Sequence, residues 1–196
     1  MSTARLPAAR RRRQLLDVAV QVFGVRGFHG TSMNDVATAA GVTKPVLYQH
    51  FGSKRDLYRE VLEDGGAQLR ERLAKATADA DGPRAQVEAG MGAYFEFVAE
   101  NEPAFTLLFG GGTRRDPEFR AIAAAVEEDV AAFIAALIDV PGLSDDERAL
   151  YAHGVVGLAE GMSRHWIEHR NPADHAALTT AVSRMAWGGL RSIRPL

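Results

Sequence analysis

The sequence predicts an all-α protein, and three observations lead to this prediction. Apolar side chains recur at helical spacing along most of the chain, strand-like alternation is scarce, and recognisable helix-starting and helix-ending residues flank the apolar stretches. The chain has 196 residues, of which 46% are hydrophobic and 24% are charged. This composition supports a folded core and excludes a wholly disordered chain.

Four helices are expected in the first 80 residues. The first stops at Gly27, and the second starts at Thr31 or Ser32, where Asp35 completes a capping-box spacing. Gly41 suits the left-handed position that follows a helix end, and a tight turn then leads into a third, short helix. The expected ranges are 7–26, 31–41, 43–52 and 53–80.

Five further helices are expected in the rest of the chain. Asp116-Pro117 is typical of a helix start, with the proline at the first helical position. Ser144 and Glu147 form a second capping box, and Asn171-Pro172 is expected to cap the last helix. The expected ranges are 84–100, 103–109, 116–139, 144–170 and 171–191.

Basic and acidic residues are unevenly distributed. Residues 1–60 hold ten Lys/Arg and four Asp/Glu, whereas residues 61–196 hold 13 Lys/Arg and 21 Asp/Glu. A basic first third suggests that this part binds a polyanion. The absence of cysteine excludes disulfides, thiolate metal sites and cysteine nucleophiles, and it fits a cytoplasmic protein.

The run Arg10 to Arg13 precedes the first apolar stretch and superficially resembles a signal peptide. Asp17 and Gln21 interrupt that stretch, and no apolar run approaches the ~20 residues of a membrane span, so no membrane partner is expected. The arginines are interpreted either as a solvated, frayed end or as an arm that contacts DNA. A transit peptide and a membrane-surface segment remain as alternatives.

The second and third helices, joined by Gly41-Val42-Thr43, match a helix-turn-helix, in which the later helix enters the major groove of double-stranded DNA. Lys44 can reach a phosphate and Gln49 can form two hydrogen bonds with adenine, whereas Leu47 and Phe51 are expected in the core. The side chains expected to reach phosphates or base edges are those of Thr31, Lys44, Pro45, Val46, Tyr48, Gln49, His50 and Lys54.

This stretch resembles the DNA-binding domain of the tetracycline-repressor (TetR) family. The family pattern is a helix ending in F-x-x-x-G-[YF], a [ST]-[ST] start, then I/V-A-x-x-A-G-V-[ST] and x-x-[LI]-Y-x-[HY]-F-x-[SN]-K-x-x-L. The matching residues are Phe23 to Phe28, Thr31-Ser32, Val36 to Thr43, Leu47 to Phe51, Ser53-Lys54 and Leu57. Pro45 departs from the pattern, because small residues such as Gly or Ala are common there.

The resemblance implies a homodimeric, ligand-responsive transcription regulator, most often a repressor that a small effector releases from a palindromic operator. It implies a three-helix DNA-binding domain over residues 1–54, with a disordered arm at 1–9, and a six-helix ligand-binding and dimerisation domain over residues 55–196. The implied phosphate contacts are Thr31, Lys44, Tyr48, His50 and Lys54, and the implied base contacts are Thr43, Pro45, Val46 and Gln49.

Large apolar residues of the acidic part can line a cavity for an apolar effector, although simple core packing is the better explanation for each residue taken singly. The candidate effector contacts are Phe95, Phe105, Leu108, Phe109, Phe133, Met162 and Trp166. The resemblance also implies that the last two helices pair with those of a second copy, and the alternative is a monomer in which they pack internally. The candidate interface residues are Val156, Ser163, Ile167, Leu178, Val182 and Met185.

No motif supports catalysis, a cofactor or a metal site. His165 and His169 have metal-pair spacing without an accompanying acidic motif, and the glycines at 110–112 lack the remainder of a phosphate-binding loop. The rival hypothesis is an all-helical enzyme or carrier that uses an apolar cavity. Glu160 and Arg164 are interpreted as a solvated or interfacial pair, and Gly65-Gly66 as a flexible point of the fourth helix.

Overall fold

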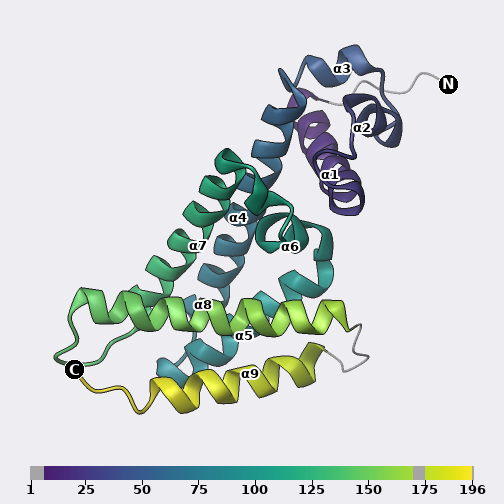
Figure 1. The fold of residues 1–196 in the computed structure, drawn as a ribbon. Coiled ribbons are helices and arrows are strands. Elements are labelled where there is room, and N and C mark those ends of the chain that lie inside the picture. The colour runs from purple at the N-terminus through teal and green to yellow at the C-terminus, as the bar shows by residue number, and fades with distance from the viewer. Residues whose placement is uncertain (1–6, 170–174, 196) are drawn as a thin grey trace. The chain divides into compact units, whose positions relative to one another are not determined.

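The computed structural model describes residues 7–169 and 175–195, apart from the side chain of Arg114, and it confirms the all-α prediction. The described residues form nine α-helices and one 3-10 helix, η1, with no strand (Figure 1). The helices are α1 (Ala8–Arg26), α2 (Met33–Ala39), α3 (Lys44–Tyr48), α4 (Lys54–Ala78), α5 (Gly82–Glu100), α6 (Glu102–Phe109), η1 (Thr113–Arg115), α7 (Pro117–Leu137), α8 (Asp145–Glu168) and α9 (His175–Leu190).

Most helix ends follow the predicted capping residues. The Ser32 hydroxyl accepts a hydrogen bond from the Asp35 N–H, and the Asp35 carboxylate accepts one from the Ser32 N–H, so Ser32 is the N-cap of α2. Ser144 and Glu147 form the same reciprocal pair at α8. The predicted cap at Asn171-Pro172 and residues 1–6 of the predicted arm lie outside the described residues.

Two short segments differ from the prediction. The helix α3 ends at Tyr48, four residues before the predicted end, because the His50 N–H donates to the Leu47 carbonyl three residues back and tightens the last turn. The 3-10 helix η1 was not predicted, since its start depends on Thr113, whose hydroxyl donates to the Leu107 carbonyl at 2.5 Å.

The chain divides into two compact units. The N-terminal unit comprises the chain up to Gly65 together with Pro103–Ala123, and the C-terminal unit comprises Gly66–Glu102 together with the chain from Ala124. The boundary between the two units lies between Gly65 and Gly66, inside α4. The predicted domain boundary lies between residues 54 and 55, at the start of that helix. The helix α6 and the first residues of α7 therefore fold with the helix-turn-helix segment.

The core of the N-terminal unit is an aromatic cluster that joins the first helices to the start of α7. The Tyr58 ring lies 4.9 Å from the Phe23 ring and 4.5 Å from the Phe119 ring, between ring centres, and Phe28 lies 4.8 Å from Phe119. The Tyr58 hydroxyl shares a 2.7 Å hydrogen bond with the hydroxyl of Thr113. These contacts fix the start of α4 within the unit.

In the C-terminal unit α5 packs against α9 and α8, and Figure 1 shows α8 and α9 running side by side. Alanines at the contacts let the helix backbones approach closely, and Ala152 and Ala159 on α8 and Ala186 on α9 are all buried. No helix in the described residues combines the length and apolarity required to cross a membrane.

Candidate DNA-binding and effector sites

The turn between α2 and α3 depends on one glycine. Gly41 has a φ of 64°, in the left-handed region that side chains other than glycine's rarely adopt. Thr43 is the N-cap of α3, and its hydroxyl makes no capping hydrogen bond. The hydroxyl of Thr43 is exposed and therefore available to a partner.

One face of α3 is buried and the other is open. Leu47 and Phe51 are 0% and 2% exposed, as predicted for core residues. The opposite side forms what we call the recognition surface: Thr43, Lys44, Pro45, Tyr48 and Gln49 are exposed, and Val46 and His50 are half-buried. The Lys44 ammonium lies 5.8 Å from the centre of the Tyr48 ring, which keeps its positive charge on this surface.

Thr31 and Lys54, both predicted to contact phosphates, already hold the helix-turn-helix together. Thr31 is 2% exposed, and its hydroxyl donates to the Gly27 carbonyl at 2.9 Å. The Lys54 ammonium donates to the Phe28 and Thr31 carbonyls, each at 2.9 Å, and lies 4.3 Å from the centre of the Phe28 ring. The Thr31 hydroxyl therefore has no hydrogen left to donate to a phosphate, whereas the Lys54 ammonium has one N–H left.

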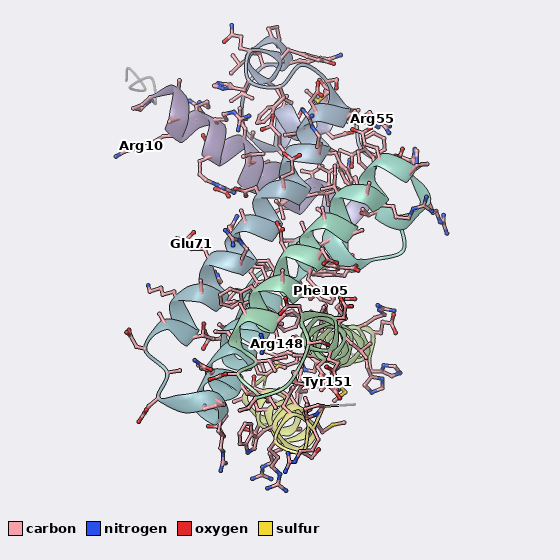
Figure 2. The ribbon with its side chains drawn as sticks, turned by 90° about the vertical axis from the view of Figure 1, so that its left-hand side faces the viewer. Arg10, Arg55, Glu71, Phe105, Arg148 and Tyr151 are labelled. Carbon is pink, nitrogen blue, oxygen red and sulfur yellow. The ribbon has the colours of Figure 1, made fainter. Side chains whose placement is uncertain are left out.

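The basic run at the start of α1 is partly neutralised. Arg12 pairs with Glu60, and Arg13 pairs with Asp64 at 2.6 Å, so both fasten α1 to α4 within the N-terminal unit. Their partners lie about 50 positions away in the sequence, and no local pattern predicts such pairs. Arg10 is exposed and points away from α1 in Figure 2, so it is the member of the run best placed to reach a phosphate.

The sequence analysis did not identify Arg55 as a residue that holds the N-terminal unit together. Its guanidinium donates to the Asp116 carboxylate at 2.8 Å and to Glu118, and it lies 4.7 Å from the centre of the Phe119 ring. Asp116 also accepts from the N–H groups of the first turn of α7. Desolvation raises the pKa of Asp116, but the hydrogen bonds from Arg55 and from these N–H groups together outweigh it, so the pKa is lowered. The predicted cap at Asp116-Pro117 is thus confirmed and bonded to the start of α4.

The predicted effector contacts fall into two groups. Phe105, Leu108 and Phe109 are buried in α6 of the N-terminal unit, where the Phe105 and Phe109 rings lie 5.1 Å apart between centres. The other four lie in the C-terminal unit: Phe95 is 1% exposed, and Phe133, Met162 and Trp166 are half-buried. Their role as effector contacts stays a prediction.

The predicted interface residues differ in what they offer to a second copy. Met185 is 57% exposed, and Val156, Ile167 and Leu178 are half-buried. Ser163 and Val182 are both 0% exposed, so their own chain already covers them and they offer no surface to a partner. The spacing placed these two residues on a helix face but could not show which side the chain itself covers.

Two family models match this chain. The model described as "Bacterial regulatory proteins, tetR family" matches residues 15–61, and the one described as "Tetracyclin repressor-like, C-terminal domain" matches residues 83–189. The HTH-type transcriptional activator FasR of Mycolicibacterium smegmatis is 33% identical over 96% of this chain and 87% of its own length. The chain belongs to the TetR family of bacterial transcriptional regulators.

Solved structures of transcriptional regulators share the fold. A TetR-like transcriptional regulator from Rhodococcus sp. RHA1 is 29% identical, with a TM-score of 0.77 over 96% of this chain and 100% of its own. FadR from Bacillus subtilis, solved in complex with stearoyl-CoA, has a TM-score of 0.79 at 18% identity over 90% of this chain and 98% of its own. Family membership gives this chain a DNA-binding helix-turn-helix, and contact between the recognition surface and DNA stays a prediction.

Proposed function

We propose that this TetR-family regulator acts as a homodimer that binds a palindromic operator and leaves it when a small apolar effector binds. The observation that supports the DNA-binding part is the recognition surface, whose exposed polar side chains stand on a short helix with a fully buried inner face. Two copies related by two-fold symmetry would place two such helices in successive major grooves, ~34–36 Å apart.

Selection from random duplex DNA at two salt concentrations tests this proposal. We expect a palindrome whose half-sites lie about one helical turn apart, with an affinity that falls steeply as salt rises. The matched control is Lys44→Ala with Gln49→Ala, which removes two exposed side chains and should recover no common sequence. If the native protein recovers none either, the enzyme or carrier hypothesis gains ground.

Dimerisation is proposed through the exposed faces of α8 and α9. Gly154, Gly157 and Gly161 lie on one side of α8, and a Cβ added to any of them would meet no atom within 4 Å. Leu150 at the start of α8 and Met185 on α9 are 61% and 57% exposed, so both large apolar side chains are available to a second copy.

A charged side chain on α8 tests this interface. Gly157→Glu should shift the native dimer to a monomer in sedimentation velocity, because the helix backbones could no longer approach closely. Gly111→Glu is the control, since its Cβ also meets open space but it stands in a loop after α6. A monomeric native protein would refute this part of the proposal.

The effector is proposed to be a long-chain acyl compound such as an acyl-CoA. The supporting observations are the buried aromatic and aliphatic side chains of the C-terminal unit and the fold shared with FadR of Bacillus subtilis, which was solved with stearoyl-CoA. Stearoyl-CoA should change the fluorescence of Trp166, which is half-buried on α8, and should release labelled operator DNA. Binding to the protein without DNA release would refute the proposed regulation.

Gly65 and Gly66 remain the proposed flexible point of α4, through which effector binding would alter DNA binding. The boundary between the two units lies between these glycines. They also permit close packing, since a Cβ on Gly66 would stand 2.5 Å from Cγ2 of Val126, and one on Gly65 would stand 3.3 Å from Cδ1 of Leu108. The test therefore combines Gly65→Ala with Gly66→Ala and Val126→Ala, so that the added methyl has room. Effector-driven release should change more than basal DNA affinity, and an equal loss of both would contradict the proposal.

Activation of transcription is the second candidate function. FasR, which matches this chain along almost its entire length, is named a transcriptional activator. Transcription in vitro from a promoter that carries the selected operator distinguishes activation from repression. The repressor proposal requires transcript levels to fall when the protein is added and to recover when the effector follows.

A further inference from the structure

In the described part of the C-terminal unit, three buried hydroxyls lack a hydrogen-bond partner, and two of them belong to Tyr94 and Ser163. Tyr94 on α5 is 6% exposed and Ser163 on α8 is 0% exposed. Neither the Tyr94 hydroxyl nor the Ser163 hydroxyl makes a hydrogen bond of acceptable geometry. Since buried polar groups are nearly always satisfied, this pair is prepared for a partner that the chain alone does not supply.

The surroundings of the pair restrict what that partner can be. The Ser163 hydroxyl is close enough to the Tyr94 hydroxyl to lower the pKa of the phenol as a hydrogen-bonding neighbour does, although the two hydroxyls do not have the geometry of a hydrogen bond. Glu160 is 7% exposed, which contradicts the solvated alternative for this residue and leaves the interfacial one open, and its carboxylate lies 4.0 Å from the half-exposed Arg164. Both hydroxyls are buried, and burying an ionised ligand group beside them costs far more free energy than burying a neutral one.

The tyrosine itself remains a neutral donor. Burial is the largest influence on Tyr94, and it raises the pKa of the phenol above its ordinary value. The hydroxyl therefore keeps its proton and can donate to an oxygen, while the Ser163 hydroxyl can donate or accept.

We propose that Tyr94 and Ser163 form a binding site for one neutral oxygen-bearing group, a carbonyl or a hydroxyl, of an otherwise apolar effector. The inference rests on the proposed effector-binding function and deepens it, because it states which effectors the unit accepts. An alcohol, ester or thioester fits the site, whereas a fatty acid that places its carboxylate there must bury an ionised group.

Three twelve-carbon probes that differ at one end test the proposal: 1-dodecanol, dodecanoate and dodecane. Binding to the full-length protein is followed by tryptophan fluorescence and confirmed by calorimetry. The native protein should bind 1-dodecanol about tenfold more tightly than dodecanoate and than dodecane, in keeping with the net value of one or two hydrogen bonds.

The substitutions Tyr94→Phe and Ser163→Ala should each weaken 1-dodecanol binding by about tenfold and leave dodecane binding unchanged. Because each removes a hydroxyl without a partner, neither should lower the Tm. Ser183→Ala is the matched control: its hydroxyl is also buried and without a partner, but it is not among the groups that act on Tyr94, so 1-dodecanol binding should not change.

The proposal is overturned if the native protein binds none of the probes, if it prefers dodecanoate, or if Tyr94→Phe and Ser163→Ala bind 1-dodecanol as the native protein does. The last outcome would mean that an ordered water satisfies the pair. Operator release is measured separately with the same probes. Tight, hydroxyl-dependent binding without DNA release supports this site and refutes only the proposed regulation.

Discussion

The two units of this regulator differ in how they treat buried polar groups. In the N-terminal unit, the hydroxyls of Thr31, Tyr58 and Thr113 and the ammonium of Lys54 all form hydrogen bonds within the unit. In the described part of the C-terminal unit, several buried polar atoms have no hydrogen-bond partner: Tyr94 OH, Asn101 Nδ2, Arg148 Nε, Ser163 Oγ and Ser183 Oγ.

This difference fits two kinds of binding. A surface that reads DNA gains affinity when it is fixed beforehand, because fewer side chains and loops must be ordered on association. A unit that binds a small molecule inside can leave polar groups for that molecule to satisfy. The comparison therefore predicts that substitutions in the N-terminal unit act on fold and DNA affinity, whereas matched substitutions in the C-terminal unit act on effector binding.

The largest effect is expected on the recognition surface. Lys44→Ala should weaken operator binding by about tenfold or more and reduce the slope of log K against log salt by about 2, one phosphate contact in each subunit. The Tm should not change, since Lys44 is exposed. Lys75→Ala, which removes another exposed lysine of the chain, is the control and should leave affinity and slope unchanged.

Lys54→Met tests the structural role of the second lysine. Loss of two charged hydrogen bonds to the Phe28 and Thr31 carbonyls should cost about 3 kcal/mol and lower the Tm by about 6–12 °C. Thermal unfolding followed by circular dichroism measures this shift. An unchanged Tm with weaker DNA binding would instead mean that Lys54 contacts a phosphate, as the sequence analysis predicted.

These two lysines also show how far the sequence could predict the site. The motif located the helix-turn-helix, and helical spacing separated Leu47 and Phe51 from the exposed side chains. The spacing of residues could not show that the Lys54 ammonium donates hydrogen bonds to two carbonyls of its own chain. One of these carbonyls, that of Phe28, lies 26 positions earlier in the sequence. The capping boxes at Ser32 and Ser144 were predictable because all of their atoms lie within four residues.

The acidic part was less predictable for a related reason. Its helices are apolar on more than one face, so periodicity alone could not decide which faces the chain itself covers. Glu160 and Ser163 are buried, whereas Gly154 and Met185 on the same pair of helices are exposed. Only the packing of α5 and α9 against α8 determines this choice.

A matched pair of hydroxyl deletions tests the comparison directly. Thr113→Val in the N-terminal unit leaves the Tyr58 hydroxyl and the Leu107 carbonyl without their partner, and should cost about 2 kcal/mol, or about 4–8 °C in Tm. Ser183→Ala in the C-terminal unit removes a hydroxyl that has no partner, and should change the Tm by no more than about 2 °C. Equal losses of Tm in the two variants would contradict the difference between the units.

The smallest effect is expected at the capping box of α2, where it depends on pH. Hydrogen bonds from the Ser32 hydroxyl and backbone N–H lower the pKa of Asp35 from its ordinary value of 3.8. The folded state therefore binds fewer protons here than the unfolded state, so the stabilisation is complete at neutral pH and is lost as the pH falls below 3.8.

Asp35→Asn should accordingly lower the Tm slightly at pH 7. The difference in Tm between this variant and the native protein should vanish in acid, once the Asp35 carboxylate of the native protein is protonated. Asp129→Asn, at an exposed position in the middle of α7, is the control for the loss of one negative charge. A difference that persists unchanged in acid would mean that the Asp35 charge contributes nothing and that the Ser32 hydroxyl alone caps α2. The preorganisation of the recognition surface would then rest on the Gly41 turn and the Lys54 contacts, without help from an ionised carboxylate.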